Sequence, residues 1–233
     1  MLERLREEVL EANLELVRQG LVLYTFGNVS GIAREKGLVV IKPSGVPYEE
    51  MKPEHLVVTD LEGHVVEGKL RPSSDLPTHL VLYNYFAEIG GVAHSHSAYA
   101  TAWAQARKPI PCFGTTHADY FHGPVPVTSE MTDPEIAEDY EKNTGHVIVR
   151  ALQKNSADAY PGVLVANHGP FAWGEDAADA AHHAAILESI ARIAYFTMAI
   201  DAGAKPAGRA LRDKHYFRKH GGNAYYGQTK NKQ

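Results

Sequence analysis

Two histidines one residue apart, His94 and His96, stand at the end of a short apolar run. If that run is a β-strand, residues i and i+2 point to the same face, and the two Cα atoms lie roughly 7 Å apart. Imidazoles at that spacing can bind one metal ion, and imidazole suits zinc and other first-row metals. Surface or hydrogen-bonded core histidines are the alternative, so the interpretation depends on what else could complete the site.

His168 has a similar setting, because it follows a second apolar run, Gly162 to Ala166, and precedes Gly169. Three histidines leave a fourth coordination position open, which is typical of catalytic rather than structural zinc. Asp75 is a candidate for that position, either as a carboxylate ligand or as a base that substrate displaces. Its place before a predicted helix is also that of an ordinary N-cap, and both readings stay open.

Two loops combine hydroxyl side chains with backbone N–H groups that regular structure leaves free. Lys42-Pro43-Ser44-Gly45 follows a predicted strand, and Pro72-Ser73-Ser74 precedes a predicted helix. Such groups at a helix N-terminus bind anions, and a lysine adds positive charge. Neither loop matches a Walker sequence or a dinucleotide fingerprint, and Gly27-Asn28-Val29-Ser30-Gly31 does not either. Each loop alone is common, but together they predict a phosphate pocket.

Two further groups lie later in the chain. Asp119 stands in a polar stretch between Thr116 and Tyr120, where a carboxylate is commonly a turn residue. The C-terminal segment is polar but carries Tyr225 and Tyr226. Polar tails commonly fray, whereas aromatic rings are unfavourable in water. We therefore expect this segment to dock, with a neighbouring subunit as one candidate surface.

Periodicity and turn signals predict the elements that must position these residues. The mixture lacks a strict alternation of strand and helix, and no repeat or linker divides it, which favours one α/β/α layered domain with a partly antiparallel sheet. Residues 109–123 are expected to be irregular. Helices are predicted at 2–16, with a stop at Gly20, and at 76–86, 98–107, 131–153, 176–202 and 207–220. The helix at 131–153 is expected to break near Gly145. Strands are predicted at 38–41, 56–59, 64–67, around 92–96 and at 162–166.

Composition excludes several classes of protein. The 233 residues, 44% of them apolar, suffice for a sizeable core in one large domain or two small ones. A formal net charge of −5 gives no basic footprint for nucleic acid. The single cysteine, Cys112, cannot form an intrachain disulfide, and no run resembles a signal peptide or a membrane span. We expect a soluble cytoplasmic protein that binds neither nucleic acid nor membrane.

Taken together, these motifs resemble those of the class II sugar-phosphate aldolase and epimerase family, over residues 2–228. The resemblance implies one α/β domain over 1–228, with a central, mostly antiparallel sheet flanked by helices on both faces, and a tail at 229–233. The motifs that carry it are Lys42–Gly45, Ser73-Ser74-Asp75-Leu76-Pro77-Thr78-His79, His94-Ser95-His96, Gly114–Tyr120, Asn167–Gly174 and Lys214–Gln228.

The resemblance also implies a C4 homotetramer with its sites between adjacent subunits. It implies one divalent metal ion per subunit, Zn²⁺ or alternatively Mn²⁺ or Co²⁺. Asp119 and Tyr226 match an acid/base pair, with Tyr226 coming from the neighbouring chain. The other implied residues are His94, His96, His168 and Asp75 at the metal, Gly27, Asn28, Lys42, Ser44, Gly45, Ser73 and Ser74 for phosphate and substrate, and Thr116, Glu141, His215 and Arg218 in support.

The implied activity is the interconversion of L-ribulose 5-phosphate and D-xylulose 5-phosphate in arabinose catabolism, by cleaving and re-forming the C3–C4 bond. An epimerase paralogue acting on L-xylulose 5-phosphate shares the same residues and stays open. An aldolase of the fuculose-phosphate type would share the metal site, but that branch carries Glu where Asp75 stands. A non-catalytic module like the adducin head domain would not need all three histidines, Asp75, Asp119 and Tyr226.

Overall fold

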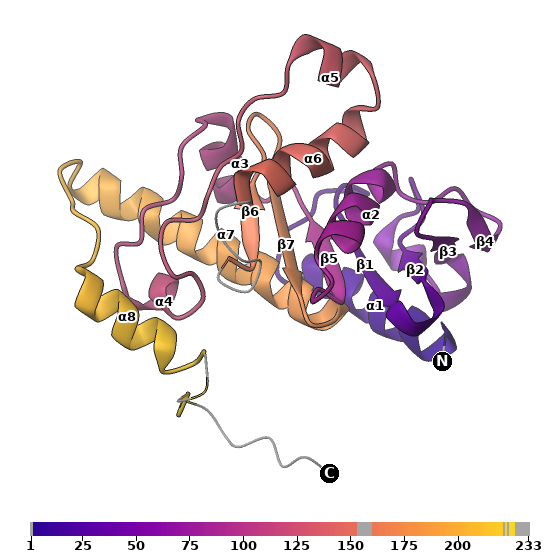
Figure 1. Cartoon of the computed structure of the whole chain (residues 1–233), viewed down its shortest axis with the longest axis horizontal. Coiled ribbons are helices and arrows are strands. Elements are labelled where there is room, and N and C mark those ends of the chain that lie inside the picture. Colours follow the sequence, from indigo (N-terminus) through magenta and orange to yellow (C-terminus); the bar gives the residue numbers. More distant parts are fainter. Residues whose placement is uncertain (1, 153–159, 221, 223, 227–233) are drawn as a thin grey trace.

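A computed structural model describes residues 2–152, 160–220, 222 and 224–226, and its centre is one seven-stranded sheet (Figure 1). The strand order is β4-β3-β2-β1-β5-β7-β6, and every pair of neighbouring strands is antiparallel. The strands are β1 Asn28–Ala33, β2 Leu38–Ile41, β3 Val57–Asp60, β4 Val65–Glu67, β5 Gly91–His94, β6 Gly162–Leu164 and β7 Pro170–Gly174.

Helices cover both faces of this sheet, which confirms the predicted layered α/β fold. Helices α1 and α7 pack on one face, and α2 and α6 pack together on the other (Figure 1). The described helices are α1 Leu2–Arg18, α2 Leu76–Tyr85, α3 Ala98–Gln105, α4 Thr115–Ala118, α5 Asp133–Ala137, α6 Tyr140–Leu152, α7 Ala177–Ile200 and α8 Arg209–Phe217. Three short 3-10 turns add η1 Arg34–Lys36, η2 Tyr48–Glu50 and η3 Pro53–His55.

Alternation along the strands explains the two layers. Val39 and Ile41 of β2 join the core beneath α2 and α6, whereas Val40 between them joins the core beneath α1 and α7. In β5, Val92 and Ala93 divide in the same way. Since successive strand side chains point to opposite faces, a run with both faces buried is favoured by apolar side chains at every position. The predicted apolar strands β2 and β5 therefore lie on either side of the central strand β1.

Several local features of the structure differ from the prediction. Strands β1 and β7 were not predicted, and 109–123 contains the short helix α4. The strand with the histidines ends at His94, so His96 lies beyond it. The helix predicted at 131–153 breaks at Asp139, whose φ is +47°, and not at Gly145. Gly145 instead lets α6 approach α2, because a Cβ there would lie 2.6 Å from Cβ of Val81.

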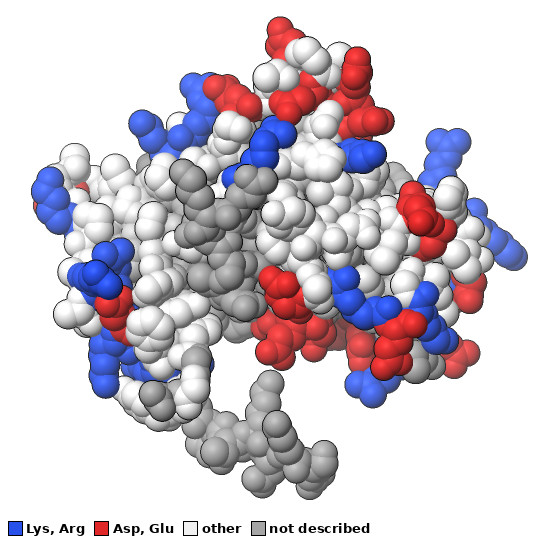
Figure 2. Space-filling model, in the orientation of Figure 1, with Lys and Arg blue, Asp and Glu red and all other residues white. Residues whose placement is uncertain are grey.

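Helix α8 packs against α4 at one end of the molecule, far from β3 and β4 at the other end (Figure 1). On the face in Figure 2, Lys and Arg side chains are interspersed with Asp and Glu side chains. Among the described residues, no helix has the length and apolar character needed to cross a membrane. The predicted domain boundary at residue 228 and the tail at 229–233 lie outside the described residues.

Candidate active site

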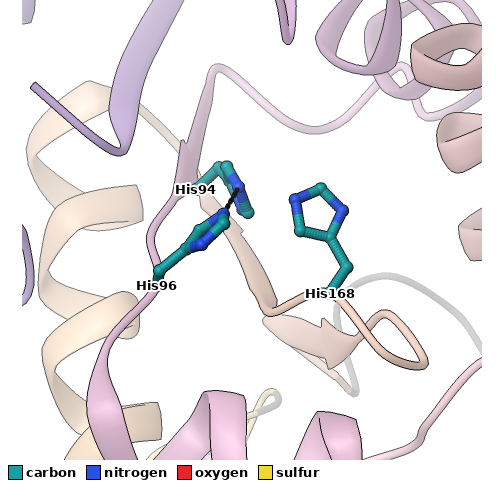
Figure 3. A group of neighbouring side chains, drawn as sticks. All are labelled: His94, His96 and His168. Carbon is teal, nitrogen blue, oxygen red and sulfur yellow. Dashed lines mark hydrogen bonds between the residues drawn. The ribbon is translucent and has the colours of Figure 1, made fainter.

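Three histidines meet where β5 ends and the chain enters β7 (Figure 3). Antiparallel pairing sets His94 opposite Phe171, so the turn that carries His168 lies beside the end of β5. This turn needs Asn167 at φ +60° and Gly169, where a Cβ would lie 2.8 Å from the carbonyl oxygen of Ser95. The ligand nitrogens of His94, His96 and His168 lie within 4.8 Å of one another.

The imidazoles are held with nitrogens facing inward. Nδ1 of His94 donates to the carbonyl oxygen of Pro170 at 2.9 Å, which leaves its Nε2 lone pair for a ligand. That Nε2 lies 3.1 Å from Nε2 of His96. Nδ1 of His168 lies 3.4 Å from the Tyr140 hydroxyl. Nitrogens of a tetrahedral zinc site are about 3.3 Å apart, so this donor set fits a divalent metal ion.

Electrostatics favour the neutral, metal-binding form of the imidazoles. Burial is the main cause that lowers the pKa of both His96 and His168, and the neighbouring His94 is the second. Asp75 lines the same space, although it is outside the group of atoms within 4.8 Å. Burial raises the pKa of Asp75, but the nearby histidines and a 2.6 Å hydrogen bond from Asn28 outweigh it and lower the pKa overall. A carboxylate therefore faces the histidines.

The histidines open into a cavity of about 420 Å³. The two loops predicted to bind phosphate run side by side along it, because the Ser73 amide donates to the Lys42 carbonyl and the Ser44 amide to the Arg71 carbonyl, both at 2.9 Å. Predicted residues that line the cavity are Gly27, Asn28, Lys42, Ser44, Gly45, Ser73, Ser74, Asp75, His94, His96, Glu141 and His168. Pro43, inside the predicted Lys42–Gly45 loop, also lines the cavity, as do Thr25, Phe26 and Tyr140, which no motif marked.

Lys42 is the cation of this cavity and is 2% exposed. Within the described part of the chain, its Nζ donates to the carbonyl oxygens of Thr25 and Pro43, both 3.3 Å away, and no carboxylate forms an ion pair with it. Burial lowers the pKa of Lys42 to about 8, against the opposing effect of Asp75. Its positive charge is therefore available to an anion.

A second cluster of predicted residues lies where α4 and α8 end. The Asp119 carboxylate accepts hydrogen bonds from Arg218 at 2.7 and 3.0 Å and from Nδ1 of His215 at 2.9 Å. The guanidinium of Arg218 lies 4.6 Å from the centre of the Tyr226 ring. Burial raises the pKa of Asp119, but the bonds from Arg218 and His215 outweigh it and lower the pKa overall. Asp119, His215, Arg218 and Tyr226 thus form one unit, the Asp119 cluster.

The Asp119 cluster does not line the histidine cavity of its own chain. Thr116 is also separate, because it lines a small cavity of about 220 Å³ beside Ile190, Ile193 and Ala194 of α7. One chain therefore brings twelve of the predicted residues together and leaves the other five, including the predicted acid/base pair, at the end where α4 and α8 lie (Figure 1).

Comparisons with known proteins find relatives in both sequence and fold. The chain is 53% identical over 227 residues to the "L-ribulose-5-phosphate 4-epimerase UlaF" of Salmonella paratyphi A and of Salmonella typhi, covering 97% of this chain and all of each relative. An L-fuculose 1-phosphate aldolase superposes with a TM-score of 0.76 at 28% identity, covering 91% of this chain and 94% of that one. The corresponding Thermus thermophilus aldolase gives 0.69 at 25%, covering 89% and 100%.

A family model described as "Class II Aldolase and Adducin N-terminal domain" matches residues 7–195. That range contains the whole sheet, the three histidines and the loops that line their cavity. It ends within α7, before α8 and the last residues of the Asp119 cluster. Because the match extends over most of the chain and agrees with close relatives, this protein belongs to the class II aldolase and adducin N-terminal domain family.

Proposed function

We propose that the protein is a metal-dependent epimerase that interconverts L-ribulose 5-phosphate and D-xylulose 5-phosphate. One observation carries the proposal: three inward-facing histidines and the ammonium of Lys42, which forms no ion pair with a carboxylate of the described residues, face the same cavity. A sugar phosphate needs both features, a site for its hydroxyl and carbonyl oxygens and a site for its phosphate. Relatives at 53% identity that bear the name of this activity support the substrate assignment.

The chemistry follows from the position of C4. Its hydrogen is not α to the C2 carbonyl, so removing it gives no stabilised anion. The C3–C4 bond is an aldol bond. A base takes the C4 hydroxyl proton, C4 becomes an aldehyde, and the electron pair of the broken bond forms an enediolate over C2 and C3. The aldehyde of glycolaldehyde phosphate then rotates, and the bond re-forms on its other face with C4 inverted.

His94, His96 and His168 would hold the metal ion, with the Asp75 carboxylate beside them. When bound, a divalent ion such as Zn²⁺ supplies Lewis-acid stabilisation of negative charge on the ketose oxygens. Asn28 keeps Asp75 oriented through its 2.6 Å hydrogen bond. Lys42 and the Ser44–Gly45 and Ser73–Ser74 loops would bind the phosphate, which retains the aldehyde fragment while it turns.

Inversion requires a proton acceptor and donor on the two sides of C4, and we assign these roles to Asp119 and Tyr226. Neither lines the cavity of its own chain, so we infer that a neighbouring copy brings its Asp119 cluster to the cavity, as in a C4 homotetramer. An exposed apolar stripe on α7, formed by Ile193, Phe196 and Ile200, supports association, since such faces mark interfaces. The arabinose pathway and the cytoplasm remain the expected setting.

The test is a coupled assay of the metal-loaded protein with L-ribulose 5-phosphate, which follows D-xylulose 5-phosphate and free glycolaldehyde phosphate in the same sample. We expect rapid epimer formation, little free aldehyde, and loss of activity with EDTA. L-Xylulose 5-phosphate, tested in parallel, distinguishes the paralogous substrate. Release of aldehyde without epimer would instead indicate an aldolase, the activity named for the fuculose-phosphate neighbour.

A further inference from the structure

Tyr48, the first residue of η2, is 4% exposed and lies against the cavity lysine. Nζ of Lys42 stands 4.8 Å from the centre of its ring. Its hydroxyl donates to the carbonyl oxygen of Gly27 at 2.8 Å and approaches that of Phe26 at 3.2 Å. One side chain therefore contacts both the buried ammonium and the turn at 25–28, which also lines the cavity.

That turn has little freedom to move. Gly27 has a φ of +80°, and a Cβ there would lie 2.9 Å from the carbonyl oxygen of His94. The turn also supplies the Thr25 carbonyl to Lys42 and carries Asn28, which bonds Asp75. A bond from Tyr48 to Gly27 thus restrains the turn that contacts both Lys42 and Asp75.

The two oxygens that accept from Lys42 are both 3.3 Å away, which is beyond the usual range for this kind of bond. A carboxylate in their place would hold the ammonium firmly but neutralise it. An aromatic face attracts a cation without neutralising it. The Tyr48 ring can therefore restrain the flexible lysine stem while the positive charge of the ammonium stays available to an incoming anion.

We propose that Tyr48 is a positioning residue for phosphate: its ring holds Nζ of Lys42 at the cavity, and its hydroxyl fixes the 25–28 turn. The inference rests on the proposed phosphate pocket and adds a residue to it. It concerns substrate binding and not the bond-making step. Loss of the ring should therefore raise KM more than it lowers kcat.

The experiment measures binding of inorganic phosphate to the full-length, metal-loaded protein by calorimetry, together with KM and kcat. In Tyr48→Leu we expect the Kd for phosphate to rise about tenfold and KM to rise in parallel, with kcat within about threefold of wild type. Tyr48→Phe keeps the ring, and its Kd should stay within about threefold. Tyr48→Met fills more of the volume and replaces the Leu variant if that does not fold.

A matched control is Tyr160→Leu, which removes a partly buried tyrosine that packs against the core and does not line the cavity. Its Kd for phosphate should equal that of wild type. A wild-type Kd in Tyr48→Leu would overturn the inference and leave the proposed function intact. Equal weakening in the Leu and Phe variants would assign the effect to the hydroxyl and overturn the role of the ring. Absence of phosphate binding in wild type would instead refute the pocket itself.

Discussion

Asp119→Asn separates acid/base chemistry from metal binding. The substitution keeps the size of the side chain and removes its charge. The amide can still accept from Arg218 through one oxygen, but its NH₂ group replaces the oxygen that accepts from Arg218 at 2.7 Å. Two donors then face each other, so the Asp119 cluster loses at least one charge-assisted hydrogen bond. Such bonds contribute about 1.5–3 kcal/mol, and the fold should tolerate that loss.

The catalytic effect should be larger. A positioned acid or base contributes about 10²–10⁴-fold to the rate, which corresponds to about 3–5 kcal/mol in the activation free energy. We expect kcat for L-ribulose 5-phosphate to fall by that factor. Metal content should stay at the wild-type value, because Asp119 is not one of the side chains whose ligand atoms gather with those of the three histidines. The measurements are the coupled epimerase assay, metal analysis and thermal unfolding.

Asp213→Asn is the matched control. Asp213 lies on α8, the helix that carries His215, and pairs with His122 and Arg209 at 3.0 and 3.3 Å, outside the Asp119 cluster. The same chemical change there should leave kcat within about twofold of wild type. Unchanged turnover in a folded Asp119→Asn protein would refute the acid/base assignment. Loss of metal together with activity in Asp119→Asn would refute the separation between the Asp119 cluster and the three metal-binding histidines.

Three further predictions concern the metal, acid stability and helix packing. His96→Ala should lose both activity and bound metal. Its affinity for the metal should fall by more than the about 10–100-fold that is lost when a residue hydrogen-bonded to a metal ligand is removed. Wild-type metal content in this variant would contradict the metal site. Burial lowers the pKa of His117 to about 4, so the unfolded chain binds the extra proton below about pH 6.5 and stability falls from there toward pH 4, by up to about 1.4 kcal/mol per pH unit. His117→Gln should show a shallower acid loss in chemical denaturation at pH 7, 6 and 5, and an unchanged slope would argue against this cause. Gly145→Ala should destabilise by about 1–3 kcal/mol, because its Cβ would lie 2.6 Å from Cβ of Val81; an unchanged denaturation midpoint would show that the helices separate freely.

The sequence was informative where local patterns decide structure. Strand β2 spans the predicted 38–41, because Leu38, Val39, Val40 and Ile41 are apolar and mostly β-branched, as burial on both faces requires. Helices α1 and α7 formed close to the predicted positions through their own periodicity. Residue types also predicted the chemistry, since imidazoles, a lysine and hydroxyl-rich loops are the groups that a metal ion and a phosphate need.

Strand β1 shows what local patterns miss. Asn28, Ser30 and Gly31 are poor strand formers, yet β1 pairs with β2 on one side and β5 on the other. Each polar member has a specific tertiary reason to be buried: Asn28 bonds Asp75, and Ser30 bonds both His79 and Tyr83. These partners are about 47 to 53 residues away in sequence, as the pairings show, so no local window contains the signal.

The sequence by itself therefore determined the layered fold class, the long elements and the types of chemical group in the site. Only the tertiary structure decided how those groups are distributed. His96 joins His94 and His168 from beyond the end of β5, because antiparallel pairing brings the turn before β7 to that end. Asp119 joins Arg218 and not the histidines, because α4 packs against α8. Such placement depends on contacts between segments that are far apart in the sequence, and the spacing of residues along the chain does not predict those contacts.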